Sequence, residues 1–281
     1  MSTTSAPASA STLPVIAFIG GGNMASAIIG GLIHQGHPAS QIEVVEPWAE
    51  AREALRKNYG IEAQAEAGPA LQRAQIVVWA VKPQTFKDAA AQAKAHTQGA
   101  LHLSVAAGIR SDSIAQWLGT ERIVRTMPNT PALVGKGMSA LYARPAVSAP
   151  ERQSIEAIMA TTGEFLWVDS EPQLDAVTAL SGSGPAYVFY FLEAMTRAGT
   201  GMGLTEQQAH QLAVGTFVGA SELARRSDDP PSVLRQRVTS KGGTTYAALQ
   251  SMEAAGVAAS FEAAMRAAQH RAHELGDEFG A

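Results

Sequence analysis

The fold of this chain is decided by the stretch Phe18-Ile19-Gly20-Gly21-Gly22-Asn23-Met24-Ala25. It has the form Gly-x-Gly-x-x-Ala and lies between an apolar run at 13–19 and a helical pattern at 24–34. In dinucleotide-binding folds the first glycine makes a tight turn, the second lets the backbone approach a pyrophosphate, and the small third residue packs helix against strand. The flanking strand and helix argue against a glycine-rich turn that binds nothing. The predicted cofactor contacts are Ile19, Gly20, Gly21, Gly22, Asn23 and Met24.

Outward from this motif, β-rich runs alternate with helical segments, as is typical of βαβ units. The sequence predicts strands at 13–19, 41–46, 75–81, 101–106, 122–126, 139–142 and 164–168, the last of them an edge strand. It predicts helices at 24–34, 49–58, 86–96, 111–118 and from 148 to about 163. The runs are apolar, as in a sheet covered on both faces. Ser148 and Glu151 form a capping box at the start of the last helix. These features predict an α/β fold with a doubly wound, Rossmann-type sheet.

The sequence pattern changes after Asp169, where β-branched runs give way to Ala, Leu, Glu, Gln and Arg at helical spacing. We therefore expect a disordered tail at 1–12, a dinucleotide-binding domain at 13–169 and an all-helical domain at 170–281. The helix that begins near Pro185 is apolar nearly all round. Such a helix is not stable in water on its own, so we expect it to be buried between subunits.

An acidic residue, Glu46, ends the second predicted strand about 20 residues after the glycine motif, where such domains hold the adenosine ribose. A carboxylate there accepts from a 2′-hydroxyl and repels a 2′-phosphate, which favours NADH. Arg52 follows a short way onward and offers a partner for a phosphate, which favours NADPH. The sequence leaves both NADPH and NADH open as the cofactor.

Two further strand ends carry small residues at the edge where ligands of open α/β sheets bind. They are Ala80-Val81-Lys82 and Ala106-Ala107-Gly108. Small residues there let nicotinamide and ribose lie against the backbone, and Lys82 puts a positive charge near the cofactor or a substrate carboxylate. A solvated surface lysine is the alternative for Lys82. We predict that all six residues contact the cofactor.

The composition argues against several other classes. The net charge is only −4 and the 21 basic residues are scattered, so we expect no nucleic-acid partner. The chain has no cysteine. His270 and His273 are spaced so that they could share a metal, but no third ligand is suggested nearby and the other five histidines lack such a spacing, so we expect no metal. Neither Ser181 nor Ser183 is centred in the Gly-x-Ser-x-Gly motif of hydrolases. Without a signal peptide or a bilayer-spanning apolar run, we expect no membrane partner, a small-molecule substrate and a cytoplasmic location.

A second loop lies in the helical half, at Val238-Thr239-Ser240-Lys241-Gly242-Gly243-Thr244-Thr245, and helical sequence follows it. Its two glycines free the backbone, so several amide N–H groups can converge with the positive end of the helix. This arrangement is a receptor for a carboxylate, although an ordinary helix N-cap has the same pattern.

Five blocks of sequence resemble the pyrroline-5-carboxylate reductase family and follow the family's order. They are 18–24, 80–83, Met127-Pro128-Asn129-Thr130-Pro131, Leu180-Ser181-Gly182-Ser183-Gly184-Pro185-Ala186-Tyr187, and 239–245 with Ala248-Leu249. Together they cover the chain from Phe18 almost to its end. One departure is Lys241, where the family usually has proline before the glycine pair.

The resemblance implies a Rossmann domain, a helical domain that interlocks with a second subunit, and hydride transfer from NAD(P)H to the C=N bond of 1-pyrroline-5-carboxylate, giving L-proline. It also implies homodimers, which in the family often assemble into decamers. By position, Thr245 would be the catalytic residue and would hydrogen-bond the ring nitrogen. The implied substrate-binding residues are Ser240, Gly243 and Thr244 for the carboxylate and Asn129 beside the nicotinamide. Glu171 is a further candidate near the cofactor.

Two other functions stay open. Another NAD(P)-dependent imine or β-hydroxyacid reductase would have a similar pair of domains. That group generally puts a catalytic lysine or aspartate on the interdomain helix, and residues 183–190 contain neither. A noncatalytic dinucleotide sensor would need the cofactor loop but no second receptor loop, so the loop at 238–245 argues against it.

Overall fold

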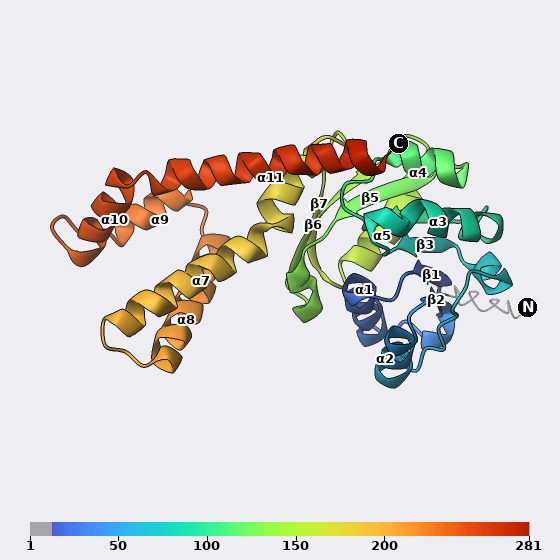
Figure 1. Cartoon of the computed structure of the whole chain (residues 1–281), viewed down its shortest axis with the longest axis horizontal. Coiled ribbons are helices and arrows are strands. Elements are labelled where there is room, and N and C mark those ends of the chain that lie inside the picture. Colours follow the sequence, from blue (N-terminus) through green and yellow to red (C-terminus); the bar gives the residue numbers. More distant parts are fainter. Residues whose placement is uncertain (1–12, 281) are drawn as a thin grey trace, which may run out of the picture. The chain divides into compact units, whose positions relative to one another are not determined.

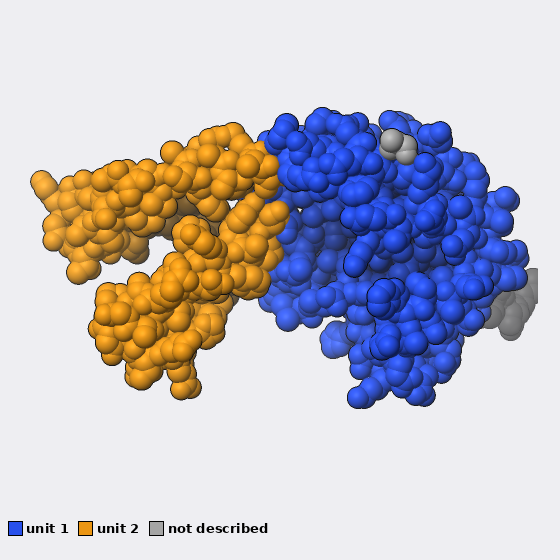
Figure 2. All heavy atoms as spheres, viewed as in Figure 1, with its two compact units in different colours: residues 1–182, 269–281 blue, residues 183–268 orange. Residues whose placement is uncertain are grey.

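The structure, a computed structural model, describes residues 13–280, so the tail predicted at 1–12 lies outside the described residues. The chain forms two compact units (Figure 2). Unit 1 contains residues 13–182 together with 269–280, and unit 2 contains residues 183–268. The domain boundary predicted after Asp169 stays a prediction.

Unit 1 is built on one seven-stranded sheet (Figure 1). Its strands are β1 (Ile16–Ile19), β2 (Ile42–Val45), β3 (Ile76–Trp79), β4 (Leu101–Ser104), β5 (Ile123–Met127), β6 (Gly137–Ala143) and β7 (Gly163–Trp167). They lie in the order β2-β1-β3-β4-β5-β6-β7, so β7 is an edge strand as predicted. The first five strands are parallel, β6 runs antiparallel to β5, and β7 is parallel to β6. The predicted Rossmann-type sheet is confirmed.

Both faces of the sheet are buried, as the apolar strands predict. In β1, Ile16 and Phe18 join one core cluster while Ala17 and Ile19 join the other, because successive side chains of a strand point to opposite faces. The first cluster is completed by helices α1 (Asn23–His34), α2 (Ala49–Tyr59) and α5 (Ala149–Met159). The second is completed by α3 (Pro83–Ala93) and α4 (Ser111–Leu118).

Local chemistry sets where these helices begin and end. The capping box of Ser148 and Glu151 is formed at the start of α5, as predicted. The helix predicted at 86–96 instead begins at Pro83, because the fixed φ of proline suits the first helical turn. Residues 94–96 form a short 3-10 helix after it. The α2 and α4 helices both end at a glycine in the left-handed region, Gly60 and Gly119.

The end of the chain packs on unit 1. Helix α11 (Val257–Phe279) brings Asp277 to Arg110 at 2.6 Å, and the Ser113 hydroxyl donates to the carbonyl oxygen of Gly280 at 2.6 Å. A Cβ on Gly108 would lie 2.8 Å from the Cβ of Leu275, so the backbone of the 106–108 loop passes close to this helix. The last turns of α11 therefore support the loop for which cofactor contacts are predicted.

Unit 2 is helical. It contains α7 (Gly184–Gly201), α8 (Glu206–Arg226), α9 (Pro231–Arg237), α10 (Thr244–Ala254) and the first part of α11. Tyr187 and Phe191 of α7 pack edge-on against Phe261 of α11. Large apolar side chains of α7 stay outside this packing, since Phe189 is 58% and Tyr190 66% exposed. No helix within residues 13–280 combines the length and apolarity needed to cross a bilayer.

A buried histidine in the sheet makes folding stability depend on pH. The His102 Nδ1 atom accepts a hydrogen bond from the Trp79 indole N–H at 3.0 Å, which requires that this nitrogen carry no proton. Burial, together with the nearby Arg122 charge, lowers the pKa of His102 to about 4. The unfolded chain takes up the proton near pH 6.5, so protonation favours the unfolded state between these two values.

We therefore expect the free energy of unfolding to fall by about 3 kcal/mol because of His102 as the pH drops from 6.5 towards 4. Urea denaturation across this range measures it. The variant His102→Gln keeps an acceptor for Trp79 but does not titrate there, so its curve should be flatter. Parallel pH curves for the two proteins would refute the assignment.

Candidate cofactor and substrate sites

The glycine loop after β1 has a backbone that a side chain would disturb. Gly20 has φ +97°, in the left-handed region, and a Cβ on it would lie 2.5 Å from the carbonyl oxygen of Ala80. Its amide donates to the carbonyl oxygen of Val45 at 2.8 Å, so the loop passes between the ends of β2 and β3. This is the edge of the sheet where ligands of open α/β folds bind.

The N-terminus of α1 has open space around Gly22, the second glycine of the Gly-x-Gly-x-x-Ala motif. Gly22 is the N-cap and has no side chain to bind the amides of the first turn. A Cβ placed on it would meet no atom of the described residues within 4 Å. Gly22 and Asn23 are exposed. Room, free amide donors and the positive end of a 12-residue helix together fit a pyrophosphate group.

The carboxylate of Glu46 is fixed against this loop. Its Oε2 accepts from the Gly21 amide at 2.7 Å and its Oε1 from the Trp48 amide at 2.9 Å. Glu46 is buried, with 7% of its surface exposed. The nearby Arg52 guanidinium donates to two carbonyl oxygens, that of Glu46 at 2.9 Å and that of Pro47 at 2.7 Å. Gly21, Glu46 and Arg52 are thus brought together at the ends of β1 and β2.

The ends of β3 and β4 supply the other predicted cofactor contacts. Ala80 and Val81 lie beside Gly20, and Lys82 is the exposed N-cap of α3. Ala106 is buried, whereas Ala107 and Gly108 are partly exposed. Gly108 has φ +74°, a backbone conformation that residues other than glycine rarely adopt. These six residues stay predicted contacts.

Asn129, predicted to lie beside the nicotinamide, already has hydrogen-bond partners within unit 1. Asn129 donates from Nδ2 to the carbonyl oxygen of Ser181 at 3.1 Å and accepts at Oδ1 from the Met138 amide at 2.9 Å. Its side chain ties the segment after β5 to β6 and to the π-helix at Thr178–Gly182. Its contact with nicotinamide stays a prediction.

Glu171 lies in a polar network at the start of α4. Its carboxylate accepts from the amide and the hydroxyl of Ser111, at 2.5 and 2.6 Å, and pairs with the buried Arg125 at 2.6 Å. Sequence reasoning missed this pair, although Arg125 gave a signal, since a buried charge within an apolar strand needs a partner. Glu171 therefore holds α4 directly after the 106–108 loop.

The predicted receptor loop lies in unit 2, before α10. Gly242 has φ +76°, and Gly243, rather than a threonine, is the N-cap of α10. The Gly243 amide donates to the Ser240 carbonyl oxygen at 3.0 Å, closing a turn. Thr244 and Thr245 begin the helix, and both are exposed. Their amides lie in the first turn, where a helix has no acceptors of its own.

No group of three or more His, Cys, Asp or Glu side chains suited to a metal ion occurs among residues 13–280. The predicted sites offer backbone amides, hydroxyls, the Glu46 carboxylate and Lys82. This inventory fits a dinucleotide-dependent oxidoreductase, whose reacting hydride comes from the cofactor.

Comparison with known proteins identifies the family. Residues 15–108 match the model "NADP oxidoreductase coenzyme F420-dependent", and residues 171–275 match "Pyrroline-5-carboxylate reductase dimerisation". The chain is 45% identical to a pyrroline-5-carboxylate reductase of Pseudomonas aeruginosa, over 95% of this chain and 98% of that protein. The relative from Haemophilus influenzae is 40% identical over 93% of this chain and 97% of its own.

A solved structure of a pyrroline-5-carboxylate reductase from Coxiella burnetii matches with a TM-score of 0.86 and 37% identity, covering 93% of this chain and 98% of that one. The enzyme from Plasmodium falciparum, solved with NADP bound, matches at 0.85 with 27% identity, covering 94% and 99%. The chain belongs to the pyrroline-5-carboxylate reductase family and is an NAD(P)H-dependent oxidoreductase. The family match of residues 171–275 also supports assembly into an oligomer.

Substitutions of Gly20 and Gly22 distinguish an effect on protein stability from an effect on dinucleotide binding. We expect Gly22→Ala to leave the melting temperature unchanged, because its Cβ enters open space, and to weaken dinucleotide binding about tenfold or more by blocking the pyrophosphate. Gly20→Ala should lower both stability and affinity, because its Cβ meets Ala80. Calorimetry and dinucleotide titration measure the two quantities. Full affinity in Gly22→Ala would place the pyrophosphate elsewhere.

Proposed function

We propose that Thr245 is the catalytic residue of this pyrroline-5-carboxylate reductase, which reduces the C=N bond of 1-pyrroline-5-carboxylate to give L-proline, and that the enzyme acts in the cytoplasm. The observation that supports the proposal is that one chain contains both an intact glycine loop, in unit 1, and the loop at 239–245, in unit 2. Its relatives are named for this reaction. The bound NADPH or NADH supplies the hydride.

The start of α10 suits the carboxylate of the substrate. Thr244 and Thr245 present first-turn amides at the positive end of an 11-residue helix, which stabilises a negative charge. The Ser240 side chain is exposed next to them in the loop and adds a hydroxyl donor. The Gly243 amide is engaged in the turn with Ser240, so Gly243 contributes mainly by leaving the space at the N-cap free.

The Thr245 hydroxyl is proposed to hydrogen-bond the ring nitrogen of the imine. A C=N bond is electrophilic, most of all when protonated, so hydride attack depends on placement of the carbon more than on a strong side-chain acid. A hydroxyl both accepts from a protonated imine and donates to the amine that forms. Thr245 thus fixes the ring while hydride adds to the carbon of the protonated imine. The nitrogen keeps its proton, and its new lone pair accepts from the Thr245 hydroxyl.

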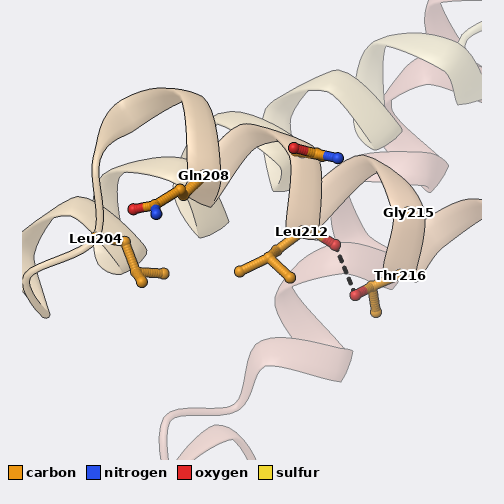
Figure 3. Close-up of a pocket in the computed structure, with 6 residues that line it drawn as sticks. Leu204, Gln208, Leu212, Gly215 and Thr216 are labelled. Atoms are coloured by element: carbon orange, nitrogen blue, oxygen red, sulfur yellow. Dashed lines mark hydrogen bonds between the residues drawn. The ribbon is translucent and has the colours of Figure 1, made fainter.

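We propose that unit 2 forms a homodimer and that dimers assemble further into a decamer. Large apolar residues on α7 and α8 support burial against another subunit, among them Phe189 at 58% and Leu223 at 69% exposure. A hollow of about 550 Å³ lies along the start of α8, and its lining includes Leu204, just before the helix, and Leu212 (Figure 3). Light scattering in solution distinguishes a dimer from a decamer.

The two alternative functions receive less support. Prephenate dehydrogenase from Aquifex aeolicus matches with a TM-score of 0.53 but only 11% identity, so it shares the fold alone. A noncatalytic sensor would not need the open first turn of α10. Neither alternative explains a relative that is 45% identical over 95% of the chain and is named for imine reduction.

Substitutions of Thr245 test the proposed role. Thr245→Val keeps the shape but removes the hydroxyl, and we expect it to lower turnover roughly 100-fold while dinucleotide affinity is unchanged. Thr245→Ser keeps the hydroxyl and should retain most activity. Turnover of 1-pyrroline-5-carboxylate and cofactor titration measure the two effects. Wild-type turnover in Thr245→Val would remove Thr245 from the mechanism.

A further inference from the structure

Trp48 is a large aromatic residue that the packing of unit 1 leaves in solvent. It follows Glu46 and Pro47 at the carboxyl end of β2, and 72% of its surface is exposed. It occupies the N-cap of α2, a position where Ser, Thr, Asp or Asn would stabilise the helix. Neither helix capping nor core packing therefore accounts for an indole at this place. An exposed ring of this size is suited to covering a ligand.

The backbone that carries Trp48 is held beside the glycine loop. The Trp48 amide donates to one oxygen of the Glu46 carboxylate, and the Gly21 amide donates to the other, at 2.9 and 2.7 Å. Arg52 holds the same segment by donating to the carbonyl oxygens of Glu46 and Pro47. The segment 46–48 is thus preorganised next to the loop that fits a pyrophosphate.

We infer that Trp48 and Glu46 form an adenosine subsite, in which the indole stacks on the adenine and the carboxylate binds a ribose with a free 2′-hydroxyl. Each Glu46 oxygen accepts one backbone amide and keeps a second lone pair for a ribose hydroxyl. Base–aromatic stacking accounts for about 1–3 kcal/mol per base in nucleic-acid complexes. This subsite deepens the proposed function, because it selects which dinucleotide the enzyme uses.

The charges around the subsite favour NADH over NADPH. A 2′-phosphate would bring a second negative charge next to the buried Glu46 carboxylate, which repels it. Arg52 lies nearby, but its Nη1 atom already donates to two carbonyl oxygens. The other guanidinium N–H groups leave Arg52 able to meet a phosphate, so its charge offsets the repulsion in part.

Binding of cofactor fragments to the full-length protein tests the subsite without any imine. The probe is ADP-ribose, titrated by calorimetry into wild type, Trp48→Ala and Trp48→Phe. We expect Trp48→Ala to bind it about tenfold more weakly, and Trp48→Phe to keep affinity within about threefold because its ring still stacks. ADP-ribose should also quench tryptophan fluorescence in wild type but far less in Trp48→Phe, because the other three tryptophans have partners within unit 1. Trp79 is buried, Trp117 packs against Phe86, and the Trp167 indole donates to Glu156.

The comparison of 2′-phospho-ADP-ribose with ADP-ribose tests the charge argument. Wild type should bind the phosphorylated fragment about tenfold more weakly or worse, and Glu46→Gln should narrow this ratio. Melting temperatures of all variants check that they are folded. Equal binding of both fragments by wild type would overturn the preference for a free 2′-hydroxyl.

Three results would overturn the role of Trp48. They are unchanged ADP-ribose affinity in Trp48→Ala, quenching that persists in Trp48→Phe, and dissociation of the oligomer in Trp48→Ala, which would make Trp48 a subunit contact. The fragments contain no hydride and no imine. Failure of the subsite is therefore distinguishable from failure of the proposed reaction.

Discussion

The close approach of Gly20 to the end of β3 is the constraint on which the cofactor site depends. With φ +97° and the Ala80 carbonyl oxygen directly beside it, this residue has no room for a side chain. The turn that it makes aims the first amides of α1 beyond the sheet edge and brings Gly21 within hydrogen-bond reach of Glu46. The predicted pyrophosphate contact and the proposed adenosine subsite both depend on this single backbone conformation.

Much of the fold could be predicted from local sequence, because apolar runs, capping boxes and glycine turns act over a few residues. Helix α4 was predicted at 111–118 and lies there, and β7 was predicted as an edge strand. The start of α3 was misplaced because the preference of Pro83 for a first turn was not used. The return of α11 to Arg110 was not foreseeable from local patterns, since it joins residues far apart in the chain.

The candidate site could be predicted in part. The glycine loop and Glu46 follow from the spacing of one motif, and the structure brings them together. The hydrogen bonds of Asn129 to Ser181 and Met138, and the pair of Glu171 with Arg125, depend on tertiary packing that no short pattern encodes. The role of Thr245 rests on family resemblance, because a threonine at the start of a helix carries no chemical signal by itself.

The central claim is that hydride transfer by this protein makes proline from a cyclic imine. The most direct measurement follows reduced-cofactor absorbance with 1-pyrroline-5-carboxylate, for NADH and NADPH in turn, and quantifies L-proline in the same samples. The account predicts one molecule of proline for each molecule of cofactor oxidised. Folded protein that binds dinucleotide but oxidises neither cofactor, or oxidises one without forming proline, would contradict it.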